Sequence, residues 1–265
     1  MTEMNSLPSP QITIISITKN DCEGIRRTVA SVQMQKFTLW QLVIVISNEQ
    51  DCAFDYVKSL NERFENIHFL IPETLGIYHA MNHAIEVFGP KLTWFLNGGD
   101  VFKNESTLSN AYFLMKKHKP SILIGGYEVN TKDGTRQFVR SSRKIQARTF
   151  SLNVRSGNHQ AMLFDFSEFE KIRFNTEFLL ASDFLLILEI LKVKSGFRTT
   201  EVFATVDPNG VSSLMVEEVW REKQNARRQV FGRYSVDWFL GHIWTLGVKT
   251  KRFLKVHEAQ VSNIR

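Results

Sequence analysis

The sequence is poor in residues that would mark a disulfide-stabilised or membrane-spanning protein. Its 265 residues include only two cysteines, Cys22 and Cys52, whose number and spacing suit neither a metal centre nor a disulfide framework. We therefore expect no disulfide and a reducing cytoplasm. The richest apolar stretch, 238–248, is short and contains His242, which argues against a membrane span. The first residues are polar and lack the apolar core of a signal peptide.

The sequence also lacks internal repeats, low-complexity linkers and a strong excess of one charge. Lys and Arg number 33 against 27 Asp and Glu, which gives a net charge of +6, and 43% of the residues are hydrophobic. This composition is typical of a globular protein with a real core. The mild positive charge favours an anionic partner such as a phosphorylated substrate or an anionic membrane, or it serves solubility alone. The basic residues are dispersed and form no recognised DNA or RNA motif, so we expect no nucleic-acid partner.

Apolar runs alternate with amphipathic segments over the first hundred residues. Strands are predicted at 12–17, 42–46, 67–71 and 92–96, and helices at 54–64 and 77–88 and from Asp21 onward. This alternation indicates an α/β fold with a doubly wound parallel sheet. Ligands of such sheets lie beyond the carboxyl ends of the strands. Asn20, Ser47 and Asp100 all fall at that edge.

The pattern changes after residue 105. We predict helices at 108–118 and 181–193, strands at 122–129, 137–140, 160–166 and 197–206, a hairpin turn at 132–134, and a helical tail from 216. Basic residues gather between 140 and 160, mostly in a predicted loop: Arg140, Arg143, Lys144, Arg148 and Arg155. The expected organisation is a disordered lead-in (1–10), one main domain (11–215) and a basic, aromatic helical extension (216–265).

Two carboxylates are candidates for metal binding or catalysis. Asp100 closes the sequence Asn97-Gly98-Gly99-Asp100 after an apolar strand, and glycines let a ligand approach the backbone closely. A Mg²⁺ or Mn²⁺ ion that bridges a diphosphate needs only one or two such carboxylates, so Asp100 could bind a metal. The alternative is a glycine turn in which the Asp100 carboxylate is merely solvated. Asp183 falls in the first turn of a predicted helix, where the helix dipole lowers its pKa, and it could equally be a helix cap. His159, taken alone, is more often structural than catalytic.

The order of these elements is more specific than any one of them. Residues 12–18, 76–82, 96–100, 159–161, 181–183 and 210–212 carry the successive motifs. This series resembles glycosyltransferase family 2, in the branch of bacterial exopolysaccharide and lipopolysaccharide sugar transferases. The resemblance covers roughly residues 10–230, and its most specific parts are the Gly-Ile-Tyr and Ala-Met-Asn element of 76–82 and the Asn-Gly-Gly-Asp element.

The resemblance implies a Rossmann-like GT-A fold, with a mixed, mainly parallel sheet flanked by helices. It also implies a nucleotide-diphospho-sugar donor and Mn²⁺ or Mg²⁺ as cofactor. Asp100 matches the metal-binding position, and Asp183 matches the base that deprotonates an acceptor hydroxyl for inverting attack. His159 and Gln160 match a pair on the acceptor side. The nucleotide sugar is expected to meet Thr18, Asn20, Ser47, Asn82, Asn97 and Gly99.

The chain also departs from the family pattern. The acidic residue usual at the end of the second strand is absent at Ile46 and Ser47, with Glu49 and Asp51 further on. His79 stands where the family usually has an aspartate, and Asn97 replaces the first acid of the metal motif. The alternative to an active EC 2.4 transferase is therefore a degenerate scaffold that binds a nucleotide sugar without turnover.

Aromatic and cationic residues interleave in the predicted extension. Such a helix suits an interface with anionic lipid headgroups, or it packs its aromatic side chains on the main domain. If the extension contacts a membrane, the protein is expected to be cytoplasmic and peripheral on the inner face of the plasma membrane. The expected acceptor is then a glycan or lipid-linked sugar, and the expected role is surface polysaccharide biosynthesis.

Overall fold

The computed structural model describes residues 9–89, 92–152, 157–169, 171, 173–208, 215–236, 238–241 and 243. Most of the predicted lead-in, the 210–212 element and the extension beyond residue 243 therefore lie outside the described residues. No helix in the described ranges is long and apolar enough to cross a membrane.

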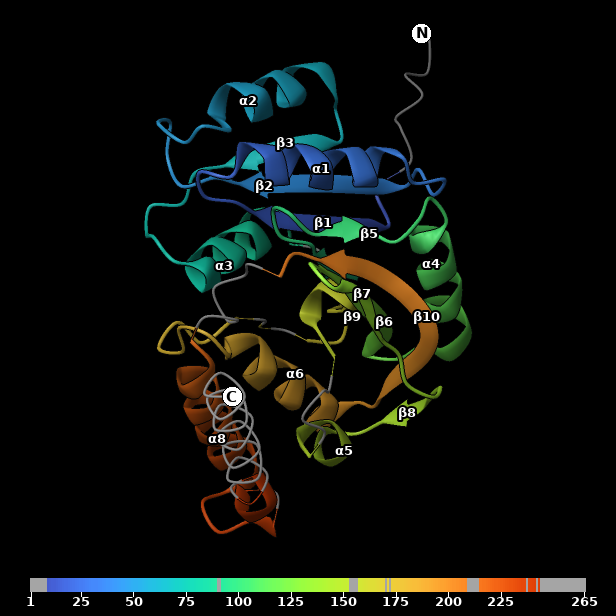
Figure 1. Cartoon of the computed structure of the whole chain (residues 1–265), viewed down its shortest axis with the longest axis vertical. Coiled ribbons are helices and arrows are strands. Elements are labelled where there is room, and N and C mark those ends of the chain that lie inside the picture. The colour runs from blue at the N-terminus through green and yellow to red at the C-terminus, as the bar shows by residue number, and fades with distance from the viewer. Residues whose placement is uncertain are drawn as a thin grey trace, which may run out of the picture.

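A ten-stranded sheet organises the chain (Figure 1). Its order is β3-β2-β1-β4-β9-β6-β10-β5, and β7 and β8 extend it by pairing with β6 and β10. The strands are β1 (Ile12–Ile17), β2 (Trp40–Val45), β3 (Ile67–Leu70), β4 (Leu92–Phe95), β5 (Val101–Phe102), β6 (Ile122–Thr131), β7 (Gly134–Phe138), β8 (Arg143–Ile145), β9 (Met162–Asp165) and β10 (Gly196–Val206). The α/β class with a mixed sheet flanked by helices is thus confirmed.

Parallel pairing is confined to two parts of the sheet. The run β3-β2-β1-β4 is parallel, as the continuous apolar strands predicted. Strand β9 lies antiparallel between β4 and β6, and β10 then returns parallel to β6. The second half is therefore not the continuation of a doubly wound parallel sheet.

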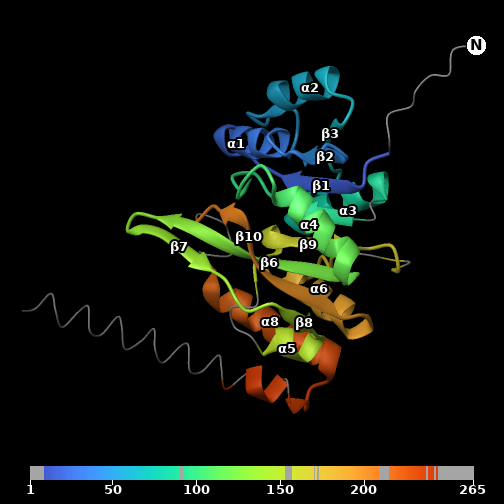
Figure 2. The same cartoon turned by 90° about the vertical axis from the view of Figure 1, so that its right-hand side faces the viewer.

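Helices cover both faces of the sheet (Figure 2). One layer holds α1 (Cys22–Gln33), α2 (Phe54–Arg63) and α4 (Thr107–His118), and the other holds α3 (Ile77–Phe88), α5 (Ala147–Ser151), α6 (Ser182–Val193) and α8 (Val216–Phe231). Successive strand residues face opposite layers: Ile14 packs with the first layer and its neighbour Ile15 with the second. Two apolar cores therefore hold the strand ends in fixed positions.

Three sequence expectations are wrong. Cys22 and Cys52 are joined in a disulfide, because the segments after β1 and β2 bring them to a Cα–Cα distance of 5.8 Å although they are 30 positions apart in the sequence. The two cysteines therefore give no indication of a reducing compartment. Residues 159–161 form a 3-10 turn before β9 rather than the start of a strand, because the Asn158 side chain accepts a hydrogen bond from the Gln160 backbone and caps that turn. The basic segment after Arg140 forms β8 and α5 rather than a loop.

Candidate active site

The turn from Asn97 to Asp100 lies at the carboxyl end of β4 and is held by helix α1. The Thr28 hydroxyl of α1 accepts a hydrogen bond from the Gly99 backbone (3.0 Å) and donates to the Asp100 carbonyl (2.8 Å). Gly99 has a φ of +94°, which only glycine adopts readily, and Thr28 is fully buried. The turn is therefore rigid, and it presents the Asp100 carboxyl from a fixed backbone.

Asp100 is an enclosed carboxyl, with only 3% of its surface exposed. Its Oδ1 accepts a hydrogen bond from the Asp207 backbone N–H at 2.9 Å. Burial raises the pKa of Asp100 to about 6, against the lowering effects of that hydrogen bond, the charge of His159 and a hydrogen bond from Gln160. The neighbouring Asp207 carboxylate raises it as well. Such a site favours a cation that would neutralise it.

The second carboxylate, Asp183, lies in the first turn of α6, as predicted. Its Oδ2 is 2.9 Å from Nδ1 of His159, and the Tyr78 hydroxyl donates to its Oδ1 over 3.4 Å. Burial raises the pKa of Asp183, but the His159 hydrogen bond and charge and the Lys223 charge outweigh burial and hold the pKa below its usual value. Asp183 is therefore an ionised carboxylate, and both of its oxygens have hydrogen-bonding neighbours.

Helix α8 completes the surroundings of Asp183. Glu222 accepts hydrogen bonds from the backbone N–H groups of Leu179, Leu180 and Ala181 at 2.8–2.9 Å. These donors precede α6, whose N-terminus has no side-chain cap of its own. Lys223 points its charge toward Asp183 and lies over the Phe184 ring at 5.2 Å. The predicted extension thus contributes directly to the site.

One cavity of about 770 Å³ gathers both carboxylates. Of the predicted site residues, Asn97, Asp100, His159, Gln160 and Asp183 line it. Three polar atoms of these residues are buried and have no hydrogen-bond partner: Asn97 Oδ1, His159 Nε2 and Gln160 Oε1. Buried polar groups are normally paired, so these atoms mark places where a bound molecule would supply the partner.

Thr18, Asn20 and Ser47 lie at the carboxyl ends of β1 and β2, outside the cavity lining. Asn20, at a left-handed φ of 51°, donates its backbone N–H to Asp51 Oδ2 (2.9 Å), and the Ser47 hydroxyl donates to the same oxygen (3.0 Å). These bonds and one from the Ala53 N–H lower the pKa of Asp51 against the effect of its burial. Asp51 joins the loops after β1 and β2, next to the disulfide.

Three predicted residues make contacts that hold the backbone around the site: Thr18, Asn82 and Gly99. Thr18 lies against Gly98, where an added Cβ would stand 2.8 Å from its hydroxyl oxygen. Both polar atoms of the Asn82 amide bond to the Phe174 backbone, at 2.7 and 2.9 Å. A Cβ on Gly99 would meet the Asp207 carboxylate at 3.2 Å.

The residues around Asp100 fit a Mg²⁺ or Mn²⁺ ion. No group of three or more His, Cys, Asp or Glu side chains in the described part of the chain is arranged to hold a metal by itself. These ions, however, take phosphate and water oxygens and need only one or two carboxylates. Asp100, the adjoining Asp207 and the unpartnered Asn97 Oδ1 supply oxygen donors of the required kind.

Four residues of the site have little local signal in the sequence: Thr28, Asp207, Glu222 and Lys223. Thr28 looks like an ordinary position of an amphipathic helix, and Asp207 stands 107 residues from its partner Asp100. Glu222 and Lys223 belong to a helix whose charges suit any solvated surface. The sequence does place Asp207 directly after the apolar strand β10, and Asp100 likewise follows β4, at the end of the turn after that strand.

Comparison with known proteins gives a family match over most of the chain. The sequence profile described as "Glycosyl transferase family 2" matches residues 13–191. The Mycobacterium tuberculosis protein Rv1514c, an uncharacterized glycosyltransferase, is 26% identical over 207 residues, which cover 77% of this chain and 78% of that protein. The putative teichuronic acid biosynthesis glycosyltransferase TuaG of Bacillus subtilis is 27% identical over 48% of this chain and 50% of its own length.

Solved structures show the same fold. The S. aureus TarS fragment 1–349, solved in complex with UDP, superposes with a TM-score of 0.66 at 17% identity, covering 83% of this chain and 66% of that one. The Pyrobaculum calidifontis mannosyltransferase PcManGT, solved with GDP-Man and Mn²⁺, superposes with a TM-score of 0.59 at 12% identity, covering 96% and 81% of the two chains.

Proposed function

This chain belongs to glycosyl transferase family 2, and we propose that it is an inverting, metal-dependent transferase that moves a sugar from a nucleotide-diphospho-sugar to a hydroxyl of a glycan or lipid-linked acceptor in surface polysaccharide synthesis. Family membership makes it a sugar transferase of EC class 2.4. The observation that carries the finer proposal is one cavity that holds Asp100 on a rigid strand-end turn and Asp183 in the first turn of α6, whose preceding segment is held by Glu222.

Asp183 is proposed as the general base. Its lowered pKa keeps it ionised at neutral pH, and the Tyr78 and His159 contacts fix its two oxygens. A base held in this way takes the proton of an acceptor hydroxyl as that hydroxyl attacks the anomeric carbon. Attack from the face opposite the leaving diphosphate inverts the configuration.

Asp100 is proposed as the metal-binding residue, with Asp207 and Asn97 beside it. A bound Mn²⁺ or Mg²⁺ would neutralise the charge that develops on the departing diphosphate. The raised pKa of the unliganded Asp100 carboxyl shows the cost of holding its charge without a cation. The TarS and PcManGT complexes with UDP and with GDP-Man and Mn²⁺ support a nucleotide-linked donor of this kind for the present fold.

Peripheral contact with an anionic membrane is proposed for the region after α8, at the inner face of the plasma membrane. Four large apolar side chains there are exposed: Tyr234, Val236, Phe239 and Ile243. Exposed aromatic and aliphatic side chains of this kind suit the interface of a bilayer. Vesicle co-sedimentation with anionic lipids tests this location, and loss of binding in a Phe239→Ser and Ile243→Ser double variant is the expected result.

The activity is tested by donor binding and turnover measured separately. UDP-, GDP- and dTDP-sugars are screened by thermal shift with Mn²⁺, Mg²⁺ or EDTA, since a ligand at 100 times its Kd stabilises the fold by about 2.7 kcal/mol. The expected result is a metal-dependent shift with one nucleotide, lost in Asp100→Ala. Asp183→Asn should bind that donor and fail to transfer, whereas Asp55→Asn, in the exposed first turn of α2, should do both. Donor binding without turnover by the wild-type protein on any acceptor would instead identify a scaffold.

A further inference from the structure

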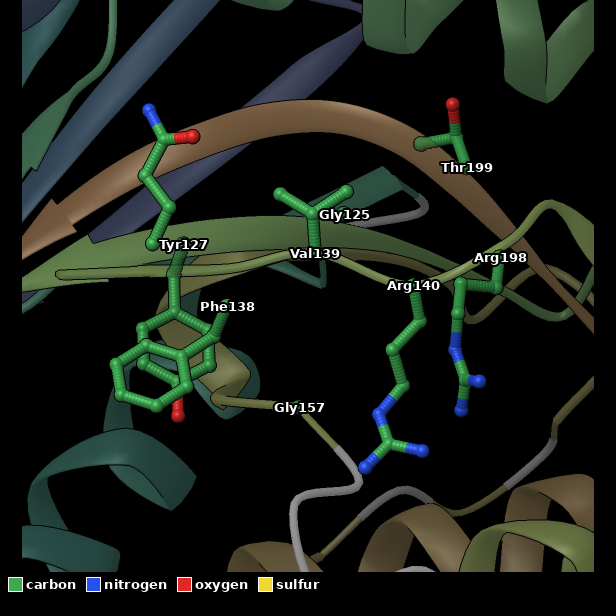
Figure 3. Close-up of a pocket in the computed structure, with 9 residues that line it drawn as sticks. Gly125, Tyr127, Phe138, Val139, Arg140, Gly157, Arg198 and Thr199 are labelled. Carbon is green, nitrogen blue, oxygen red and sulfur yellow. The ribbon is translucent and has the colours of Figure 1, made fainter.

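A second cavity lies next to the active site, between the β6–β7 hairpin and β10 (Figure 3). Its volume is about 240 Å³, and Tyr127, Phe138 and Gly157 line both cavities. Arg140 and Arg198 extend into it in the same direction. We call this cavity the arginine pocket, defined by Tyr127, Phe138, Arg140 and Arg198.

Arg198 is an unusual side chain because it is buried and, among the described residues, has no acidic partner. Only 3% of its surface is exposed, and its Nη2 has no hydrogen-bond partner. None of the ion pairs formed within the described part of the chain involves Arg198. Burial and the positive charges of Arg140 and Arg143 lower its pKa to about 10. It therefore stays charged at neutral pH.

The backbone enforces this clustering of positive charge. Arg198 of β10 pairs directly with Arg143 of β8, so two like charges stand opposite each other in the ladder. The pairing of β10 with β6 becomes irregular just after Arg198, and such bulges re-aim side chains near functional sites. A buried, unpaired charge is costly, and an anion would remove that cost. A guanidinium binds a carboxylate or a phosphate with two parallel hydrogen bonds.

The wall between the two cavities has the character of a sugar-binding surface. Tyr127 and Phe138 are cross-strand partners whose rings stack at a centroid distance of 4.7 Å and an angle of 16°. Flat aromatic surfaces bury the apolar parts of a ring-shaped ligand while leaving its polar groups free for hydrogen bonds. This wall places such a ring within reach of the arginines and next to the transfer site.

The position of the arginine pocket assigns it to the acceptor rather than the donor nucleotide. The proposed nucleotide side is formed by the strand ends of β1, β2 and β4. The pocket lies in the other half of the sheet, on β6, β7 and β10. We infer that the arginine pocket binds the anionic group of an acidic sugar unit in the acceptor, either a uronic acid carboxylate or a sugar phosphate ester. Only the assignment to the acceptor rests on the proposed function; anion binding itself does not.

Binding without any donor tests the inference directly. Methyl β-D-glucuronide, D-glucose 6-phosphate and the neutral methyl β-D-glucoside are titrated up to 50 mM into the full chain and followed by NMR chemical shifts. The expected result is binding of at least one anionic sugar that is about tenfold or more tighter than that of the neutral glucoside. The tighter of the two anionic probes identifies the group as carboxylate or phosphate.

Three variants locate the binding. Arg198→Met removes the buried charge and leaves no described residue without a hydrogen-bond partner. The urea midpoint of this variant should therefore not fall below that of the wild type. Arg140→Gln changes an exposed residue and keeps folding intact in any case. Both should weaken binding of the anionic sugar about tenfold or more. Arg136→Gln, on the same hairpin but exposed and paired with Asp133, is the matched control and should bind like the wild type.

Specific outcomes overturn the inference. Equal binding of neutral and anionic sugars, no binding of any probe, unchanged binding in both Arg198→Met and Arg140→Gln, or an equal loss in Arg136→Gln would each do so. Asp183→Asn should keep the anionic sugar bound. A protein that transfers sugar to neutral acceptors but ignores anionic ones refutes the arginine pocket alone, and one that binds anionic sugars but transfers nothing refutes the proposed function alone.

Discussion

Replacing Asp100 with asparagine should stabilise the protein without ligand while abolishing its metal-dependent donor binding. Asp100 is 3% exposed and its pKa is raised to about 6, against a model-peptide value near 3.8. The folded protein therefore binds more protons than the unfolded chain between these pH values. The contribution of Asp100 to the unfolding free energy therefore falls as pH rises through that window and is constant above it. The reason is that ionising a carboxyl whose pKa is raised in the folded state destabilises the fold.

The magnitude follows from the shift of the Asp100 pKa. A difference of about 2 pKa units costs the folded state about 3 kcal/mol once the carboxyl is fully ionised above pH 6. Part of that cost is already present at pH 4.5, because the unfolded chain ionises first. The difference in unfolding free energy between Asp100→Asn and the wild type should therefore grow by about 2 kcal/mol between pH 4.5 and pH 8.

Urea unfolding of both proteins at several pH values in EDTA measures this growth directly. Any constant effect of the asparagine amide on packing cancels, since only the change with pH is interpreted. Asp133→Asn, on an exposed hairpin turn, should track the wild type at every pH. A difference that stays constant with pH, or one that shrinks as pH rises, would refute the assignment of a raised pKa to Asp100.

Three further predictions concern the groups around the two carboxylates. His159→Ala should move the acidic limb of the kcat–pH profile to higher pH, because the lost hydrogen bond lets the Asp183 pKa rise; an unmoved limb contradicts this. Glu222→Ala should cost about 1–3 kcal/mol in urea unfolding, because the backbone N–H groups of residues 179–181 lose their charged acceptor, and it should lower kcat more than donor affinity; a loss of donor affinity alone would be inconsistent with a role in positioning α6. Cys22→Ser with Cys52→Ser should lower the unfolding free energy by about 3–4 kcal/mol for a loop closed across 30 residues, and an equal urea midpoint with and without dithiothreitol would contradict it.

The first half of the fold could be predicted because its strands are buried on both faces. Continuous apolar runs mark such strands, and the segments predicted at 12–17 and 77–88 have the bounds that the structure shows. The second half gave weaker signals. Strand β5 has two residues, too few for any periodicity, and β9 begins only after a 3-10 turn capped by Asn158. Antiparallel insertion of β9 between β4 and β6 leaves no mark on its sequence.

The site shows the same division between local and distant determinants. Asp100 and Asp183 stand at the ends of predicted elements, so their positions could be read from the sequence. The groups that set their properties come from far along the chain: Asp207 bonds to Asp100 across 107 positions, and Lys223 comes from α8. Burial of a carboxyl and its partners are products of tertiary packing, and no local pattern encodes them.

His159 connects the two carboxylates into one system. It is hydrogen-bonded to Asp183, and its charge also lowers the pKa of Asp100. Around Asp183, the His159 hydrogen bond and the charges of His159 and Lys223 outweigh the effect of burial. Around Asp100, the Asp207 and Gln160 hydrogen bonds and the His159 charge do not, and the adjoining Asp207 carboxylate adds to the effect of burial. Burial raises the pKa of both carboxyls, and the hydrogen bonds and charges around each one decide the direction of its net shift. In the mechanism proposed above, the Asp183 base is ionised before substrate arrives, and a bound cation would stabilise the Asp100 carboxylate.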